Sequence, residues 1–115
     1  MRSGEFFRAW TKSKMTVIQK KLKRLRKNVD SCDKKILQAL ARRLSVVHEI
    51  GLLKRGAGIP LKQVNRWQEI IVSRSALGKI LGLRPILIKR LFKVIHHESL
   101  QIQRELPKKN ERKRK

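Results

Sequence analysis

Apolar residues recur at spacings of three, four and seven along the stretch from Leu25 to Lys54. These spacings place them on one face of an α-helix, which completes a turn about every 3.6 residues. The members of this stripe are Val29, Ile36, Leu40, Val47 and Ile50. We expect the long helix to begin near Thr16, whose hydroxyl would cap it. It should end at Arg55, where Gly56 and Gly58 stop it.

Two shorter helices are predicted after this one. The second should run from residue 61 or 62 to residue 77. Gly78 and Gly82 should frame a link rich in turns, in which residues 79–81 could form a helical turn. Pro85, a residue suited to a first helical turn, should open a third helix that continues to Leu106. The sequence therefore predicts an all-α, three-helix chain with a long first helix. We expect a basic N-terminal extension at residues 1–15, a helical domain at 16–106 and a disordered basic tail at 107–115.

A long helix offers more apolar surface than two short helices can cover, so a chain of 115 residues is expected to dimerise. No apolar run approaches the ~18 residues of a membrane-spanning helix, and we expect no membrane association. The single cysteine, Cys32, cannot form an intrachain disulfide. It is interpreted as a buried, inert thiol, which is compatible with a cytoplasmic location.

The net charge of +23 is typical of a nucleic-acid-binding protein, but its distribution changes the interpretation. Residues 1–28 carry +9 and residues 107–115 carry +5, so the flanks hold most of the charge. The middle carries +9 without a recognisable reading helix, aromatic stacking platform or zinc spacing. We expect an anionic small molecule rather than nucleic acid as the main partner.

Three cations of the first helix have informative positions. Arg43 and Lys54 differ by about 20° in direction and by ~16 Å along a straight helix, so both could lean toward one small anion. Arg26 lies ~25 Å from Arg43 and points roughly 100° away. It could serve the same pocket only from a second copy of the chain. In isolation, Arg43 would be better interpreted as an arginine whose stem packs at a helix seam; the register of Lys54, Ser99 and Gln103 with it favours the binding role instead.

The other two predicted helices also carry polar residues on what should be inner faces. Gln63, Arg66 and Trp67 are spaced three and four apart, and the apolar stripe of the third helix continues into Ser99 and Gln103. A core lined by cations and amides needs a partner, because an unpaired buried charge costs several kcal/mol. The three histidines have no cysteine or carboxylate set at ligand spacing, so no metal site is predicted.

A family resemblance rests on the order and spacing of these residues. Arg26, Asp33, the run 40–43 (LARR), Ile50-Gly51, Lys54, Ile59-Pro60, Arg66, Leu91-Phe92, Ile95, Ser99 and Gln103 resemble the all-α (type II) chorismate mutases over about residues 22–105. The resemblance implies an interleaved helical homodimer with two active sites, each completed by Arg26 from the partner chain. It also implies a cytoplasmic enzyme of aromatic amino-acid biosynthesis (the shikimate pathway) that needs no cofactor.

The activity implied is a Claisen rearrangement of chorismate, a dicarboxylate, to prephenate. Lys54 and Gln103 would donate hydrogen bonds to the breaking ether oxygen. The substrate's carboxylates would be held by Arg26, Arg43, Arg66 and Ser99, and Gln63 could bind its hydroxyl.

Two positions depart from the family pattern and leave alternatives open. Gln63 stands where the family usually has an acidic or amide residue near the start of the second helix. The glutamate that normally follows the helix 2 arginine in this family is Trp67 here. Isochorismate-pyruvate lyases share the fold and lack carboxylates at these places, so a lyase remains an alternative. A catalytically weak mutase homologue is a second one. Trp67 itself could also be a core or interface aromatic rather than a ligand contact.

Overall fold

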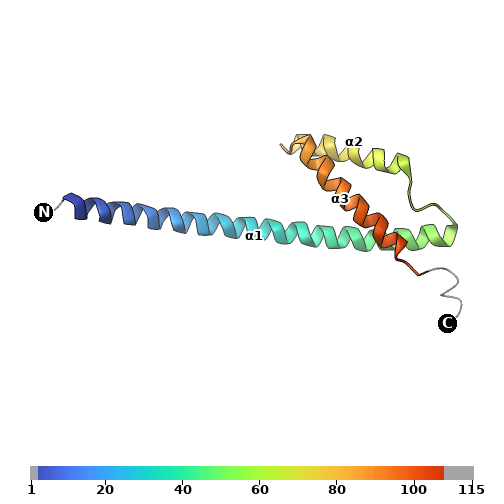
Figure 1. Cartoon of the computed structure of the whole chain (residues 1–115), viewed down its shortest axis with the longest axis horizontal. Helices are drawn as coiled ribbons and strands as arrows, with labels where there is room; N and C mark the ends of the chain where they lie inside the picture. The colour runs from blue at the N-terminus through green and yellow to red at the C-terminus, as the bar shows by residue number, and fades with distance from the viewer. Residues whose placement is uncertain (1–2, 108–115) are drawn as a thin grey trace. The chain divides into compact units, whose positions relative to one another are not determined.

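The computed structural model describes residues 3–107, which form three helices: α1 (Ser3–Ala57), α2 (Val64–Ile80) and α3 (Pro85–Arg104) (Figure 1). Strands are absent from this described range, so the predicted all-α class with a long first helix is confirmed. None of these helices has an apolar stretch long enough to cross a membrane. Except for Pro107, the predicted tail at 107–115 lies outside the described residues.

The start of α1 differs from the prediction. The helix begins at Ser3 rather than near Thr16, and Thr16 is an interior residue whose Oγ1 donates to the Lys12 carbonyl at 2.9 Å. Thr11 Oγ1 donates in the same way to the Phe7 carbonyl at 2.8 Å. A threonine hydroxyl that bonds four residues back is satisfied inside a helix and marks no helix start. The Thr16 prediction was therefore wrong.

Two glycines end the first two helices. Gly58 has φ 69°, which a residue without a Cβ adopts without strain, and Ile59 N–H donates to the Lys54 carbonyl at 2.8 Å. Gly82 has φ 79°, and Leu83 N–H donates to a carbonyl five residues earlier, also at 2.8 Å. Both ends are Schellman motifs, in which a left-handed residue lets the chain leave the helix. The first helix therefore ends two residues later than predicted.

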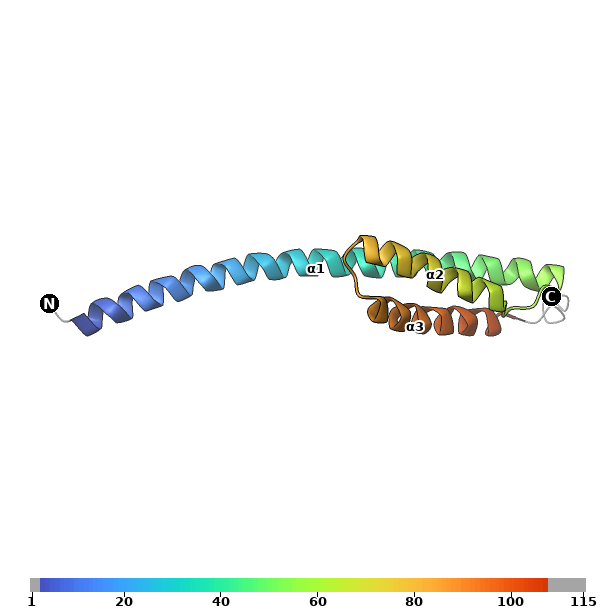
Figure 2. The same cartoon turned by 90° about the horizontal axis from the view of Figure 1, so that it is seen from above.

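The second helix is shifted relative to its predicted bounds, and Gly78 explains its far end. α2 starts at Val64 and continues through Gly78 to Ile80, so the predicted link from residue 78 was wrong there. A Cβ at Gly78 would lie 2.7 Å from Cγ1 of Ile88 on α3. Gly78 thus permits the close approach of α2 and α3, which pack against each other (Figure 2), rather than breaking the helix.

The chain divides into two compact units, residues 1–41 and 42–115. The described part of the first unit is the N-terminal portion of α1. Many of its apolar side chains remain 40–65% exposed along the helix, among them Ile18, Leu22, Leu25, Val29, Ile36 and Leu37. This apolar surface has no cover within the described unit. Cys32 is also exposed, so the prediction that its thiol is buried was wrong for the single chain.

The second unit holds the small core, to which the end of α1, α2, α3 and the segment after α3 all contribute. Its buried apolar side chains are Val47, Ile70, Ile88 and Leu106. Two polar side chains, Ser99 and Gln103, are as deeply buried, with 6% and 5% of their surface exposed. Buried polar side chains are normally hydrogen-bonded, so Ser99 and Gln103 should have specific partners.

Candidate functional site

A cavity of about 100 Å³ lies within the second unit. Its apolar wall is formed by Val47, Ile50, Leu61, Ile70 and Leu100. Its polar lining consists of Lys54 from α1, Gln63 and Arg66 from the start of α2, and His96, Ser99 and Gln103 from α3. The structure thus brings together five residues that the sequence analysis selected on three separate helices.

Arg43 joins this group through Ser99. Its Nη1 donates to Ser99 Oγ at 2.9 Å, and Ser99 Oγ in turn donates to the Ile95 carbonyl at 2.7 Å. Burial lowers the pKa of Arg43, and the nearby cations Arg74 and Arg66 lower it further. Arg43 is therefore a partly desolvated cation whose bonded partner is a neutral hydroxyl. A ligand carboxylate would offset both its burial and its repulsion by the neighbouring cations.

Lys54 and Gln103 are both held by backbone carbonyls. Lys54 Nζ donates to the Leu61 carbonyl at 3.0 Å, and Gln103 Nε2 donates to the Val47 carbonyl at 3.4 Å. Gln103 Oε1 is buried and has no hydrogen-bond partner among the described residues. Each side chain keeps further amine or amide hydrogens, so it can remain bonded to the backbone and still donate to a ligand oxygen.

The two site residues at the start of α2 are more exposed. Arg66 Nη1 pairs with Glu69 Oε2 at 3.2 Å, with the two side chains 51% and 66% exposed, so this ion pair adds only about 0–1 kcal/mol. Sequence analysis missed Glu69, although its position three residues after Arg66 on a helix is the signal for such a pair. Gln63 occupies the N-cap of α2 without a side-chain capping bond, so its amide is available to a ligand.

Arg26 does not line the cavity. It belongs to the first unit, where it borders a surface hollow together with Gln19, Leu22, Lys23, Lys27 and Asp30, all on α1. Its guanidinium bonds to no other residue among 3–107. The contribution of Arg26 from a second copy of the chain stays a prediction.

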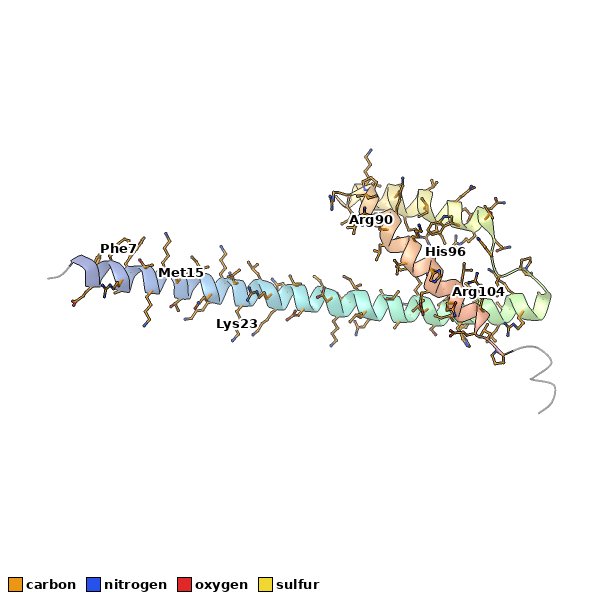
Figure 3. The ribbon with its side chains drawn as sticks, viewed as in Figure 1. Phe7, Met15, Lys23, Arg90, His96 and Arg104 are labelled. Carbon is orange, nitrogen blue, oxygen red and sulfur yellow. The ribbon has the colours of Figure 1, made fainter. Side chains whose placement is uncertain are left out.

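His96 is a cavity residue that the sequence analysis did not select. It lies on α3 (Figure 3), and its ring faces that of Trp67, with the two centroids 4.6 Å apart and the planes at 32°. Burial lowers the pKa of His96, and the charges of Arg43, Lys62 and Lys54 lower it further. Its position three residues before Ser99 places it on the same helix face, which is the signal that could have identified it.

Arg55 supports the site from outside the cavity. Its Nη1 donates to the carbonyls of Leu106 and Pro107, and its Nη2 donates to the Gln103 carbonyl at 3.4 Å. These carbonyls lie at the C-terminal end of α3, where a cation also complements the helix dipole. Arg55 therefore fixes the part of α3 that carries Gln103 against α1.

The charge of the site indicates what it can bind. Three cations, Arg43, Lys54 and Arg66, surround or border the cavity, and its lining contains neither aspartate nor glutamate among the described residues. Such a site can hold a small molecule with two carboxylates and can donate hydrogen bonds to an oxygen that gains negative charge.

Comparisons with known proteins agree with this description. The sequence model of the family described as chorismate mutase type II matches residues 25–104. The T-protein of Enterobacter agglomerans is 36% identical over 75 residues, which cover 65% of this chain and 20% of that relative. The bifunctional chorismate mutase/prephenate dehydratase of Enterobacter agglomerans is 32% identical over 86 residues, 75% of this chain and 22% of the relative. The chain thus spans about a fifth of the length of the curated relatives it matches.

Proposed function

Because the chain belongs to the chorismate mutase type II family, we propose that it catalyses the rearrangement of chorismate to prephenate. The single observation that carries this proposal is the convergence of Lys54, Arg66, Ser99 and Gln103 on one cavity, with Arg43 bonded to Ser99. Helices α1 and α2 supply cationic side chains, and α3 supplies a hydroxyl and an amide. This set of groups can bind the two carboxylates of the substrate.

The reaction needs neither a nucleophile nor a base, so the role of the protein is to hold the reactive shape and stabilise charge. Arg43 and Arg66 bind carboxylates and restrict the substrate to its compact conformer, which removes part of the entropic barrier. Lys54 and Gln103 donate to the ether oxygen as its bond breaks and negative charge gathers there. Gln63 contacts the hydroxyl end of the substrate.

The proposal is tested by incubating the purified chain with chorismate and measuring prephenate. The matched control is Lys54→Met, which keeps the length of the side chain but removes its charge and donors. We expect the wild-type chain to form prephenate and the variant to lose at least a hundredfold in kcat, as when one oxyanion donor is removed. Equal rates for the two chains, or no prephenate from the wild-type chain, would refute the proposal.

A second candidate is isochorismate-pyruvate lyase activity. The observation that favours it is the absence of carboxylates from the described cavity lining, together with Trp67 at the position of the family's glutamate. Incubation with isochorismate, followed by measurement of salicylate and pyruvate, separates the two reactions. Formation of these products without prephenate from chorismate would favour the lyase.

The active form is proposed to be a homodimer in which Arg26 of each chain completes the site of the other. The exposed apolar side chains of residues 3–41 support this, because a second chain would bury them. Sedimentation at micromolar concentration should give twice the mass of one chain, and a monomer would overturn the proposal. A cytoplasmic location and the domain bounds 1–15, 16–106 and 107–115 remain predictions.

A further inference from the structure

His96 lies between two hollows in the second unit, and the Trp67 ring packs against it. On one side is the 100 Å³ cavity that contains Lys54, Ser99 and Gln103. On the other is a larger, mostly apolar hollow of about 600 Å³. His96 lines both, whereas Trp67 lines only the larger one. The tryptophan ring therefore supports the imidazole from behind, and the imidazole is the part of the pair that faces the cavity.

The His96 side chain is held by packing rather than by hydrogen bonds. Neither ring nitrogen bonds to another residue within 3–107, and the ring is placed by its 4.6 Å contact with Trp67. An aromatic pair of this kind contributes orientation as well as attraction, since tilted and offset arrangements are preferred over a face-to-face stack. His96 thus presents polar ring atoms that remain available to a ligand in the cavity.

Burial and the cations around His96 favour the neutral form of its ring. The charged or titratable groups that face or flank it are Arg43 and Lys54 of α1, Lys62 of the connector, Arg66 of α2, and Lys93 and His97 of α3. Burial lowers the pKa of His96 below its ordinary value of 6.5, and the charges of Arg43, Lys62 and Lys54 lower it further. A neutral imidazole has one nitrogen that accepts a hydrogen bond, which an arginine or a lysine cannot do.

On the side of the cavity that His96 lines, the substrate hydroxyl needs a hydrogen-bond acceptor. The ring hydroxyl of chorismate is a donor, and Trp67 stands where the resemblance to type II chorismate mutases implies a glutamate. Lys54, Arg66 and Arg43 are donors only. The neutral side-chain acceptors in the cavity lining are Gln63 at the start of α2 and His96, Ser99 and Gln103 on α3. Ser99 already accepts from Arg43, and Gln103 is assigned to the ether oxygen, which leaves Gln63 and His96 to accept a hydrogen bond from the hydroxyl.

We propose that His96 is a substrate-contacting residue that accepts a hydrogen bond from the ring hydroxyl of chorismate, and that Trp67 is the positioning residue that orients it. This inference rests on the proposed mutase function and assigns a specificity contact within the same site. It makes Trp67 and His96 a functional pair, in which α3 supplies the hydrogen-bond acceptor that a tryptophan at position 67 cannot provide.

The test compares kcat/KM for chorismate between pH 5 and 8 in the wild-type chain, His96→Gln and His96→Phe. The wild-type value should fall about three- to tenfold as pH decreases through the lowered pKa of His96, because the protonated ring no longer accepts. His96→Gln keeps an acceptor at every pH and should lose this acid-side decline. His96→Phe keeps the ring contact with Trp67 but has no acceptor, so its value should be about three- to tenfold lower at pH 8.

The control variant is His97→Gln, because His97 is the next residue of α3 and lines the larger hollow but not the cavity. It should reproduce the wild-type pH profile.

A second measurement uses chorismate methylated at its ring hydroxyl, which cannot donate. Methylation should lower kcat/KM more in the wild-type chain than in His96→Phe, because the variant already lacks the bond. This comparison does not depend on pH.

The possible outcomes separate the inference from the proposed function. No turnover of chorismate by the wild-type chain would overturn both. Turnover with the same pH profile in wild-type and His96→Gln chains would overturn only the role of His96. A wild-type rate that rises as the pH falls would also overturn it, because the imidazolium would then be acting as a further cation for the carboxylates.

Discussion

Replacement of Gly51 by alanine tests the packing that places Gln103. An alanine Cβ at this position would lie 2.7 Å from Leu106 Cδ1 and 2.9 Å from Gln103 Cγ, both closer than carbon atoms normally approach. Gln103 and Leu106 are only 5% and 6% exposed, so neither can move freely away from the new methyl group. The variant must therefore shift α3 or push Gln103 out of its place.

The expected change in the stability of Gly51→Ala follows from two opposing effects. Alanine in place of glycine stabilises a helix interior by about 1 kcal/mol. Overfilling a packed core costs about 1–3 kcal/mol. The variant should thus be up to about 2 kcal/mol less stable than the wild-type chain. Gly56→Ala is the matched control, since it lies on the same helix with nothing within 4 Å of a new Cβ, and it should be more stable than wild type by about 0.5–1 kcal/mol.

Thermal melting at one fixed protein concentration measures the difference, which should be roughly 3–6 °C for each kcal/mol in a chain of this size. Gly51→Ala should melt below wild type and Gly56→Ala above it. Gly51→Ala should also lower kcat for chorismate, because its crowding acts on Gln103. If Gly51→Ala melts at or above the temperature of Gly56→Ala, the close approach of Gly51 to Gln103 and Leu106 is not present in solution.

Three further outcomes are expected. Gln103→Glu should be active only where the new carboxyl is protonated, so its activity optimum should move toward acid; an unchanged pH profile would remove Gln103 from the ether contact. Mixing Arg26→Ala and Lys54→Ala chains should restore activity if the two residues belong to different chains of one site, whereas heterodimers without activity would argue for sites built from one chain. Ser99→Ala removes the acceptor that holds Arg43 and should raise KM for chorismate about tenfold or more, and a KM equal to that of wild type would show that Arg43 is positioned without it.

The helices themselves were predictable because their periodicity and their end signals are local. The three-residue and four-residue spacings predicted α1 and α3, and Pro85 marked the first residue of α3. The start of α1 was not predictable from Thr16, since a threonine can serve as a cap or bond back within a helix, and the sequence does not distinguish the two. Gly78 was misread for a similar reason: a glycine that ends a helix and one that admits a neighbouring helix look alike until Ile88 is placed beside it.

In the candidate site too, residues with a local signal were predictable and residues defined by contacts between helices were not. Arg43, Lys54, Ser99 and Gln103 were found because each interrupts an apolar stripe, which is a property of one helix. His96 was missed because its importance comes from contacts between helices, namely its ring packing on Trp67 and its access to the cavity. The bond from Arg43 to Ser99 joins residues 56 positions apart, and no spacing rule within a helix predicts such a contact.

The neutral partners of the site cations have a consequence for engineering. Arg43 is held by a hydroxyl and Lys54 by a carbonyl, so neither charge is paired with a carboxylate within the described cavity lining. Burial is the main cause of the lowered pKa of Arg43, and the charges of Arg74 and Arg66 lower it further. Selection of this chain for heat resistance alone should therefore favour neutral residues at Arg43, and the resulting proteins would be robust but inactive. Under the proposed function, the chain keeps this local instability because the same uncompensated charge would attract a dicarboxylate substrate.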